Sequence, residues 1–452
     1  MEAMIERLRR ELARGESPPL SDTLLINEQS LARERLGESI VRFGFGQSPF
    51  PVHEPAVRAL AAHAADKAYL PVQGLPEARE AVARFHREAE GVDWQGEEML
   101  LAPGSKLLLF AAMKALPSDA EVLIPDPAWV SYAPQARLCG LATRRLPCDF
   151  AGRWQLDVAT LERALDEEAI DDAGRNAGDE DDGIATRASG GDRRVRLLIL
   201  NQPGNPTGLS MGHDEQAALA ACARRHGLLV LSDEIYGVLD HRGAHRPFCR
   251  DYPEGTLTST GLSKWCGAGG WRFGALHVPH ALGETLMPRL LGIASETWSS
   301  VSSPVQEAAC VAYERTPAQT RYIARQRELL AEIGGWCAHR LAEAGVRVHA
   351  PDGGFYLYVD LEPFREAFAS RGIRHSAALT RDLLERAGVA LLPGTAFGAP
   401  PERLVARLAY VSFDGEALLG TEGPVIDHAA LGTLRDGIDA VAAWVDDASA
   451  GR

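Results

Sequence analysis

Four short stretches of this chain carry residue types that can hold and modify a small charged ring. They lie at residues 201–208, 232–236, 261–264 and 270–274. An amine can form an imine with an aldehyde, a carboxylate can keep a ring nitrogen protonated, and a guanidinium can pair with two phosphate oxygens. An amide and a phenol can hydrogen-bond a ring oxygen. In chain order, the side chains of these types are Asn205, Asp233, Tyr236, Lys264 and Arg272.

In kind, order and spacing, the four stretches resemble the fold-type I, pyridoxal phosphate-dependent aminotransferases of classes I and II. The resemblance extends over nearly the whole chain. It implies that Lys264 binds the cofactor covalently, that Asp233 keeps the pyridine nitrogen protonated, and that Arg272 pairs with the phosphate. Asn205 and Tyr236 are expected at the phenolic oxygen of the ring. A surface lysine and a helix N-cap aspartate are the ordinary alternatives for single motifs, but the mutual spacing of the motifs favours the cofactor site.

The resemblance places further cofactor contacts in three other segments. Gly104, Ser105 and Lys106 open a predicted helix, where backbone N–H groups bind an anion and glycine allows a close approach. Trp129 is expected to stack on the pyridine face, with a core tryptophan as the alternative. Tyr69 matches a tyrosine that reaches the phosphate of a neighbouring subunit, which implies a homodimer with a shared active site. The expected catalytic residues are Lys264, Asp233 and Tyr236. These three residues and Ser263 are also expected to bind the cofactor.

Arg407 stands where the family keeps the arginine for the substrate α-carboxylate. A bidentate guanidinium fixes an amino acid in one orientation. Gly46 is expected to offer a backbone N–H to the same carboxylate, and Trp129 and Asn205 complete the expected substrate contacts. Lys106 aligns with a lysine that some bacterial aspartate and prephenate aminotransferases use for a distal carboxylate. A solvated lysine at a helix start is the alternative, so the substrate side chain stays open.

These residues predict a transaminase that moves an amino group from an L-amino acid to a 2-oxo acid by a ping-pong mechanism through a Lys264 aldimine. Other chemistry of the same cofactor is the alternative, because function depends on the residues around the reacting atoms rather than on the fold. A β-lyase, a cyclopropane-forming synthase and an oxidase belong to this alternative. A non-catalytic ligand-binding relative is a third hypothesis, which the intact lysine and cofactor anchors disfavour.

The elements that must position these residues alternate between short apolar runs and helical patterns, which is typical of a mostly parallel sheet. We therefore expect an α/β fold, with a mixed, mostly parallel sheet covered by helices on both faces. The motifs follow the carboxyl ends of predicted strands, where such sheets bind ligands. The predicted strands of the large sheet are Glu98–Ala102, Glu121–Ile124, Val195–Leu200, Leu228–Ser232, Thr256–Thr260 and Phe273–Val278.

The chain is expected to form a large cofactor-binding domain, residues 51–300, and a smaller α+β domain, residues 301–452. Residues 1–50 are expected to form an N-terminal arm that packs with the smaller domain, which makes that domain discontinuous. Strands are predicted there at residues 346–349, 354–359, 389–392 and 404–413, after a helix at residues 316–344. A segment rich in Asp, Glu and Gly, at about residues 166–194, predicts a flexible surface insertion.

Composition excludes several classes of protein. The formal net charge of −15 argues against a nucleic-acid-binding face. No apolar run approaches the ~20 residues of a membrane helix. The seven cysteines are scattered and never form a CxxC pair, which predicts reduced thiols in the cytoplasm and no metal site.

Overall fold

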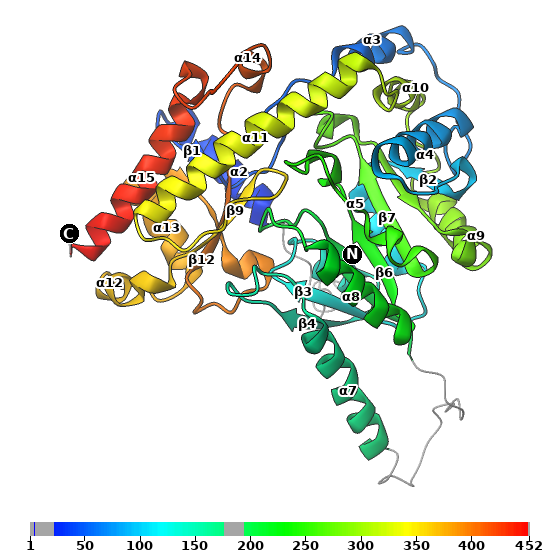
Figure 1. The fold of residues 1–452 in the computed structure, drawn as a ribbon, viewed down its shortest axis with the longest axis horizontal. Helices are drawn as coiled ribbons and strands as arrows, with labels where there is room; N and C mark the ends of the chain where they lie inside the picture. Colours follow the sequence, from blue (N-terminus) through cyan, green and yellow to red (C-terminus); the bar gives the residue numbers. More distant parts are fainter. Residues whose placement is uncertain (1–3, 5–21, 176–193, 451–452) are drawn as a thin grey trace.

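The computed structural model describes residue 4 and residues 22–175 and 194–450. Its largest element is a seven-stranded sheet in the order β2-β8-β7-β6-β5-β3-β4 (Figure 1). β8 is antiparallel to both of its neighbours, and all other neighbouring strands are parallel. The expected α/β fold with a mostly parallel mixed sheet is therefore confirmed. The strands are β2 (Met99–Ala102), β3 (Glu121–Asp126), β4 (Ala142–Pro147), β5 (Arg196–Asn201), β6 (Leu229–Asp233), β7 (Thr256–Gly261) and β8 (Gly274–His277).

Helices cover both faces of this sheet, so its central strands β5, β6 and β7 are almost wholly buried. In β5, Leu197 and Ile199 pack on one face, whereas Leu198 and Leu200 pack on the other, because successive side chains alternate. The first face is covered by α5 (Ser105–Lys114), α6 (Tyr132–Leu138) and α9 (His280–Thr297), and the second by α7 (Val158–Arg175) and α8 (His213–Arg225). None of the helices in the described ranges has the length and apolar character needed to cross a membrane.

Five features of the fold differ from the sequence-based expectation. The predicted strand at residues 389–392 is divided into two strands that belong to different sheets, and the predicted strand at residues 404–413 ends at Ala409. β4 was not predicted, because this edge strand has one strand neighbour and buries only Leu146. Residues 346–349 form a single bridge, Arg347 to Asp360, instead of a strand. α7 continues to Arg175, past the residues near 166 where the flexible insertion was predicted to begin, because no glycine or proline interrupts the helix before Gly174. The helix thus includes the first residues of the predicted insertion, and residues 176–193 lie outside the described residues.

A smaller three-stranded antiparallel sheet in the order β11-β12-β9 lies beside the large sheet (Figure 1). Its strands are β9 (Tyr356–Asp360), β11 (Leu392–Pro393) and β12 (Val405–Ala409). β1 (Val41–Arg42) pairs in parallel with β10 (Val389–Ala390), so an N-terminal segment joins C-terminal elements. The helices of this region are α2 (Asp22–Arg35), α11 (Pro317–Glu343), α12 (Arg365–Ser370), α13 (Ser376–Ala387), α14 (Gly415–Leu419) and α15 (Gly432–Ser449). Three other helices pack beside the large sheet: α3 (Glu54–Ala62), α4 (Pro76–Glu90) and α10 (Ser303–Ala312).

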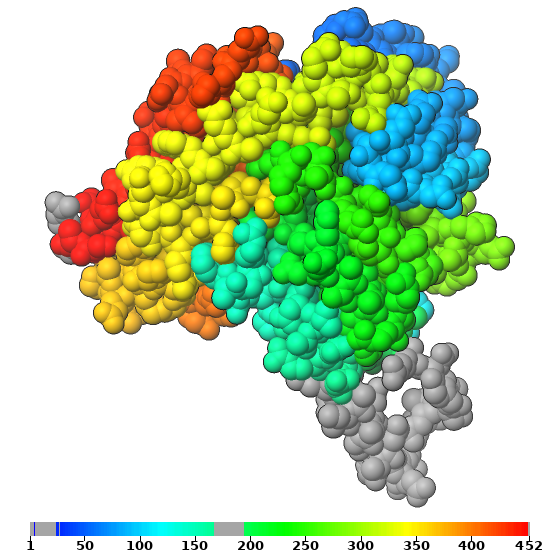
Figure 2. All heavy atoms as spheres, viewed as in Figure 1, coloured from blue at the N-terminus to red at the C-terminus, as the bar shows by residue number. Residues whose placement is uncertain are grey.

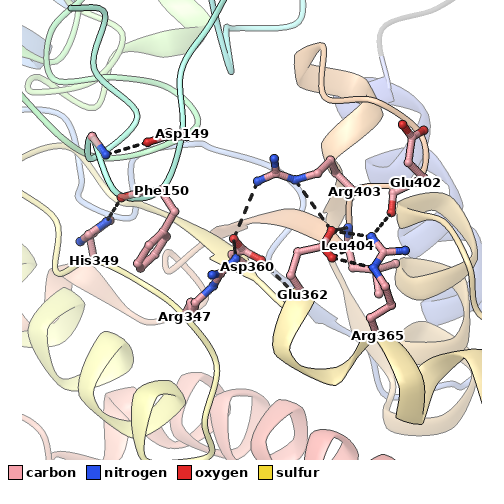
Figure 3. A network of polar contacts seen from close by, with 11 residues as sticks. Asp149, Phe150, Arg347, His349, Asp360, Glu362, Arg365, Glu402, Arg403 and Leu404 are labelled. Carbon is pink, nitrogen blue, oxygen red and sulfur yellow. Dashed lines mark hydrogen bonds and ion pairs between the residues drawn. The ribbon is translucent and has the colours of Figure 1, made fainter.

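A polar network links the connection after β4 to the smaller sheet (Figure 3). His349 Nε2 lies 2.9 Å from the carbonyl oxygen of Phe150, and the two rings stack with centroids 4.1 Å apart. Arg347 donates a hydrogen bond of 2.5 Å to the fully buried carboxylate of Asp360. Arg403 approaches the same carboxylate from the other side, at 3.9 Å. This network joins the segment after β4 to the region of the smaller sheet. In Figure 2, yellow and orange residues of the smaller-sheet region adjoin cyan ones.

Candidate active site

The carboxyl ends of β5, β6 and β7 lie side by side in the large sheet, and each delivers one of the sequence motifs. Asn201 ends β5, Asp233 ends β6, and Lys264 follows β7 by three residues. These ends open on a cavity of about 640 Å³, a size typical of small-molecule sites. All predicted site residues except Gly104 and Tyr69 line this cavity. The structure therefore brings together residues that are up to about 360 positions apart, from Gly46 to Arg407.

The amine of Lys264 lies inside the cavity. Its Nζ donates a hydrogen bond of 2.7 Å to the carbonyl oxygen of Gly46. It also lies 5.4 Å from the ring centre of Tyr236 and 5.5 Å from that of Phe355, within the range of a cation–π contact. Backbone and aromatic groups thus hold the amine at the carboxyl ends of the strands. A lysine in this position can react with an aldehyde bound in the cavity.

Asp233 is a buried carboxylate, only 4% exposed. The hydroxyl of Tyr132 donates a hydrogen bond of 2.8 Å to Asp233 Oδ2, and the backbone N–H of Ile235 approaches Oδ1 at 3.4 Å. Burial raises the pKa of Asp233 to about 6, although the Tyr132 hydrogen bond and Lys264 oppose the rise. A carboxylate that burial destabilises gains from a cationic partner, so Asp233 suits a protonated ring nitrogen.

Arg407 lies in the middle of β12, 1% exposed, with its guanidinium at the cavity. It donates hydrogen bonds to Asn205 Oδ1 at 3.0 Å and to the carbonyl oxygen of Gly44 at 2.6 Å. The rings of Tyr356 and Phe397 lie 4.7 Å and 5.0 Å from its centre. Its Nε has no hydrogen-bond partner within the described part of the chain, and burial lowers the pKa of Arg407. An anion can therefore complete the contacts of this buried cation.

The start of α5 forms an anion cradle with Arg272. Gly104 precedes the helix with a φ of 92°, and a Cβ there would lie 2.3 Å from Arg272 Nη2. Glycine is thus required for the guanidinium to approach the helix start, where the first N–H groups lack intrahelical acceptors. Arg272 itself has a φ of 59° and donates to the carbonyl oxygen of Gly269 at 2.9 Å. This arrangement suits a phosphate group.

Lys106 and Trp129 lie together at the same side of the cavity. Lys106 Nζ is 5.0 Å from the centre of the Trp129 ring. Burial lowers the pKa of Lys106, and the nearby charges of Arg272 and Lys264 lower it further. An incoming carboxylate or phosphate would relieve this repulsion.

The sequence reasoning missed two tyrosines of the site. Tyr132 carries the hydroxyl that binds Asp233, and its signal was present three residues after Trp129 in the same motif. Tyr356 places its hydroxyl 2.8 Å from that of Tyr236, and it comes from β9, in which no motif was recognised. Tyr69, by contrast, is 94% exposed and does not line the cavity of its own chain.

Comparison with known proteins assigns the chain to a family. The family model described as aminotransferase class I and II matches residues 35–411. The chain belongs to this family. The bifunctional aspartate aminotransferase and glutamate/aspartate-prephenate aminotransferase of Petunia hybrida is 31% identical over 389 residues, which cover 84% of this chain and 75% of that protein. The aspartate/prephenate aminotransferase of Thermus thermophilus is 30% identical over 385 residues, with 84% and 89% covered.

Solved structures agree with this assignment. The aspartate aminotransferase of Thermus thermophilus with maleate superimposes with a TM-score of 0.77 at 26% identity, covering 95% of this chain and 99% of that one. The chain is thus a pyridoxal phosphate-dependent aminotransferase, as the sequence predicted. The cavity of this aminotransferase fits the cofactor, because it joins an anion cradle, an amine and a buried carboxylate in one space.

Proposed function

We propose that this aminotransferase exchanges amino groups between dicarboxylic L-amino acids and 2-oxo acids by a ping-pong mechanism. The observation that carries the proposal is the cavity, which holds the buried guanidinium of Arg407 and the amine of Lys106 together with the reactive Lys264. Two cations besides the reactive amine and the phosphate partner Arg272 match the two carboxylates of such a substrate. The names of the relatives, which are aspartate and prephenate aminotransferases, support the same substrate class.

Pyridoxal phosphate, when bound, supplies an aldehyde carbon that bonds covalently to amines and a ring that accepts electrons from the substrate Cα. The start of α5 and Arg272 would hold its phosphate, and Asp233 would hold its ring nitrogen. Arg407 would bind the substrate α-carboxylate with two N–H groups and so orient the Cα–H bond. Lys264 Nζ lies in the same cavity, where it would accept the Cα proton of the substrate as a general base.

Tyr236 and Asn205 would both tune this chemistry from one side of the cavity. The Tyr236 hydroxyl is held by Tyr356, and the Asn205 amide oxygen by Arg407, so both donors are oriented before a ligand arrives. Arg407 and Asn205 are hydrogen-bonded to each other. Binding of a carboxylate at Arg407 would therefore also change the hydrogen bond that Asn205 makes to the cofactor ring.

We also propose a homodimer with a shared active site, in which Tyr69 reaches the partner's phosphate. The support is the exposure of Tyr69, 94%, which is exceptional for an aromatic side chain and means that the described residues of its own chain leave it uncovered. The seven free cysteines support the expected cytoplasmic location.

The test is the absorption spectrum of the purified enzyme during half-reactions with single amino acids. Aspartate and glutamate are expected to convert the lysine-bound cofactor to its aminated form, whereas alanine and phenylalanine react more slowly. Pyruvate release without a stable aminated form would instead identify a lyase. Lys264→Ala is expected to lose both the lysine-bound absorption and transamination.

Lys106→Met separates the two roles open to this side chain. If Lys106 binds the distal carboxylate, kcat/KM for aspartate falls about 10- to 100-fold, as for loss of a charged hydrogen bond, while that for alanine is unchanged. An equal loss for both substrates, accompanied by weaker cofactor binding, would place Lys106 on the phosphate and refute the dicarboxylic assignment. Lys114→Met, at the other end of α5, is the matched control.

A further inference from the structure

A cluster of metal-ligating side chains lies on α7 and α8, apart from the cofactor cavity. Glu162, Cys222 and His226 each offer one ligand atom, and these atoms all lie within 4.8 Å of one another. None of the three lines the cavity that contains Lys264. The proposed transamination gives these residues no role.

The cluster is built by two elements that pack together. Cys222 and His226 are four residues apart at the end of α8, so their side chains share one face. Glu162 belongs to α7, which packs on α8 through Leu161, Leu165 and Leu219. The Cys222 Sγ atom lies 4.0 Å from Glu162 Oε1. Ligands of a tetrahedral zinc ion lie roughly 3.5 Å apart, so small side-chain rotations suffice to close the site.

The chemistry of the three side chains selects the kind of ion. A thiolate, an imidazole and a carboxylate form a ligand set that suits Zn²⁺, whereas Ca²⁺ and Mg²⁺ prefer oxygen alone. A buried cysteine is often only a small apolar side chain, and Cys222 does pack in an apolar cluster. What distinguishes it is that two further ligands of suitable type, both partly exposed to solvent, stand at its thiol. An ion therefore has both a binding set and a route of entry.

One cation competes for the site. Arg225 forms an ion pair with Glu162, and the two side chains are 57% and 40% exposed. Exposed ion pairs of this kind contribute little, so Arg225 can turn into solvent when a metal ion arrives.

We propose that Glu162, Cys222 and His226 bind Zn²⁺ or a similar borderline-soft divalent cation, with water as the fourth ligand, and so tie α7 to α8. α7 projects from the body of the molecule along much of its length (Figure 1), and the bound ion fastens its base. The scattered cysteines predicted no metal site, because the third ligand lies 60 residues away on another helix. The role of the ion is structural, because the cluster contributes nothing to the reacting cavity.

The experiment is a titration of the tag-free, cofactor-loaded enzyme with Co²⁺ after treatment with a chelator. Stoichiometric binding is expected to give tetrahedral cobalt bands in the red, where the cofactor does not absorb, with a dissociation constant below micromolar. A second described cluster, His63, Asp66 and Glu307, has no thiol and cannot produce a thiolate-to-metal charge-transfer band. Zn²⁺ is expected to displace Co²⁺ and to raise the temperature of unfolding.

Variants decide the assignment. Cys222→Ser and His226→Ala are each expected to weaken cobalt binding at least about tenfold and to abolish the zinc-dependent thermal shift, while transamination is retained. His226→Ala removes a ligand at a partly exposed helix end, so it remains informative if the buried serine impairs folding. Cys139→Ser, which alters a half-buried cysteine outside both clusters, is the control and is expected to bind as the wild type does. Absent tetrahedral bands, affinity weaker than micromolar, or bands retained in Cys222→Ser would each overturn the proposal.

Discussion

The buried carboxylate of Asp233 is predicted to lower the stability of the folded protein when it is ionised, and this can be tested. Its carboxylate is 4% exposed, and burial raises its pKa from 3.8 to about 6. The folded protein therefore binds this proton more tightly than the unfolded chain does. Stability from this group is fully present below pH 3.8 and is lost as the pH rises to about 6.

The size of the loss follows from the shift. Roughly two pKa units, at about 1.4 kcal/mol each, correspond to about 3 kcal/mol of unfolding free energy. Asp233→Asn removes the titration but keeps an oxygen that can accept the hydrogen bond from Tyr132. The variant without cofactor should therefore gain up to about 3 kcal/mol on the wild type between pH 4 and pH 7. Any fixed cost of packing the amide cancels, because it is the same at each pH.

The assay is urea unfolding of both proteins, freed of cofactor, at several pH values in this range. The quantity of interest is the difference in unfolding free energy between variant and wild type, followed with pH. A difference that stays constant, or that moves in favour of the wild type as the pH rises, refutes the reasoning. Tyr132→Phe is the control, because it removes the hydrogen bond while leaving the carboxylate, and should raise the pKa of Asp233 and steepen the wild-type trend.

Three further predictions concern other parts of the site and fold. Gly46→Ala places a Cβ 2.0 Å from the Tyr356 hydroxyl, so kcat/KM should fall at least about tenfold and recover in part when Tyr356→Phe is added, measured by steady-state kinetics. Arg347→Ala leaves the buried Asp360 with a weaker partner and should cost about 2 kcal/mol in urea unfolding, whereas Arg347→Lys should cost less. Tyr69→Phe should change the unfolding free energy by less than about 0.5 kcal/mol, since the side chain is 94% exposed, but should speed cofactor release in dialysis. Unchanged release would remove Tyr69 from the phosphate site.

The parts of the molecule that sequence reasoning found are those where chemistry restricts both residue type and spacing. Asp233 and Lys264 were placed correctly at strand ends, because apolar runs such as Leu197–Leu200 can be buried only in a sheet covered on both faces. The assignment of the family followed from the same motifs. β4 contains few apolar residues, because this edge strand is mostly exposed or only partly buried. The sequence analysis therefore did not predict it.

Residues that act through another residue were harder to predict. Tyr132 and Tyr356 lie 101 and 120 positions from the side chains they bind, Asp233 and Tyr236. A tyrosine is common in a core, so its type alone does not indicate a role. The same holds for the metal cluster proposed above, whose ligands acquire meaning only when two helices are packed together.

The charges of the cavity explain why such positions resist prediction from local rules. Burial raises the pKa of Asp233 and lowers those of Arg407 and Lys106, so each group is held in a form that the protein alone disfavours. A sequence chosen for stability alone would have other residues at these three positions. In the proposed assignment, each would instead pair with a group of opposite charge on the cofactor or the substrate. Burying these charges without partners costs free energy of folding, and that cost is relieved when ligands of opposite charge bind. Binding should therefore raise the stability of the enzyme by more than the contact area of the ligands alone predicts.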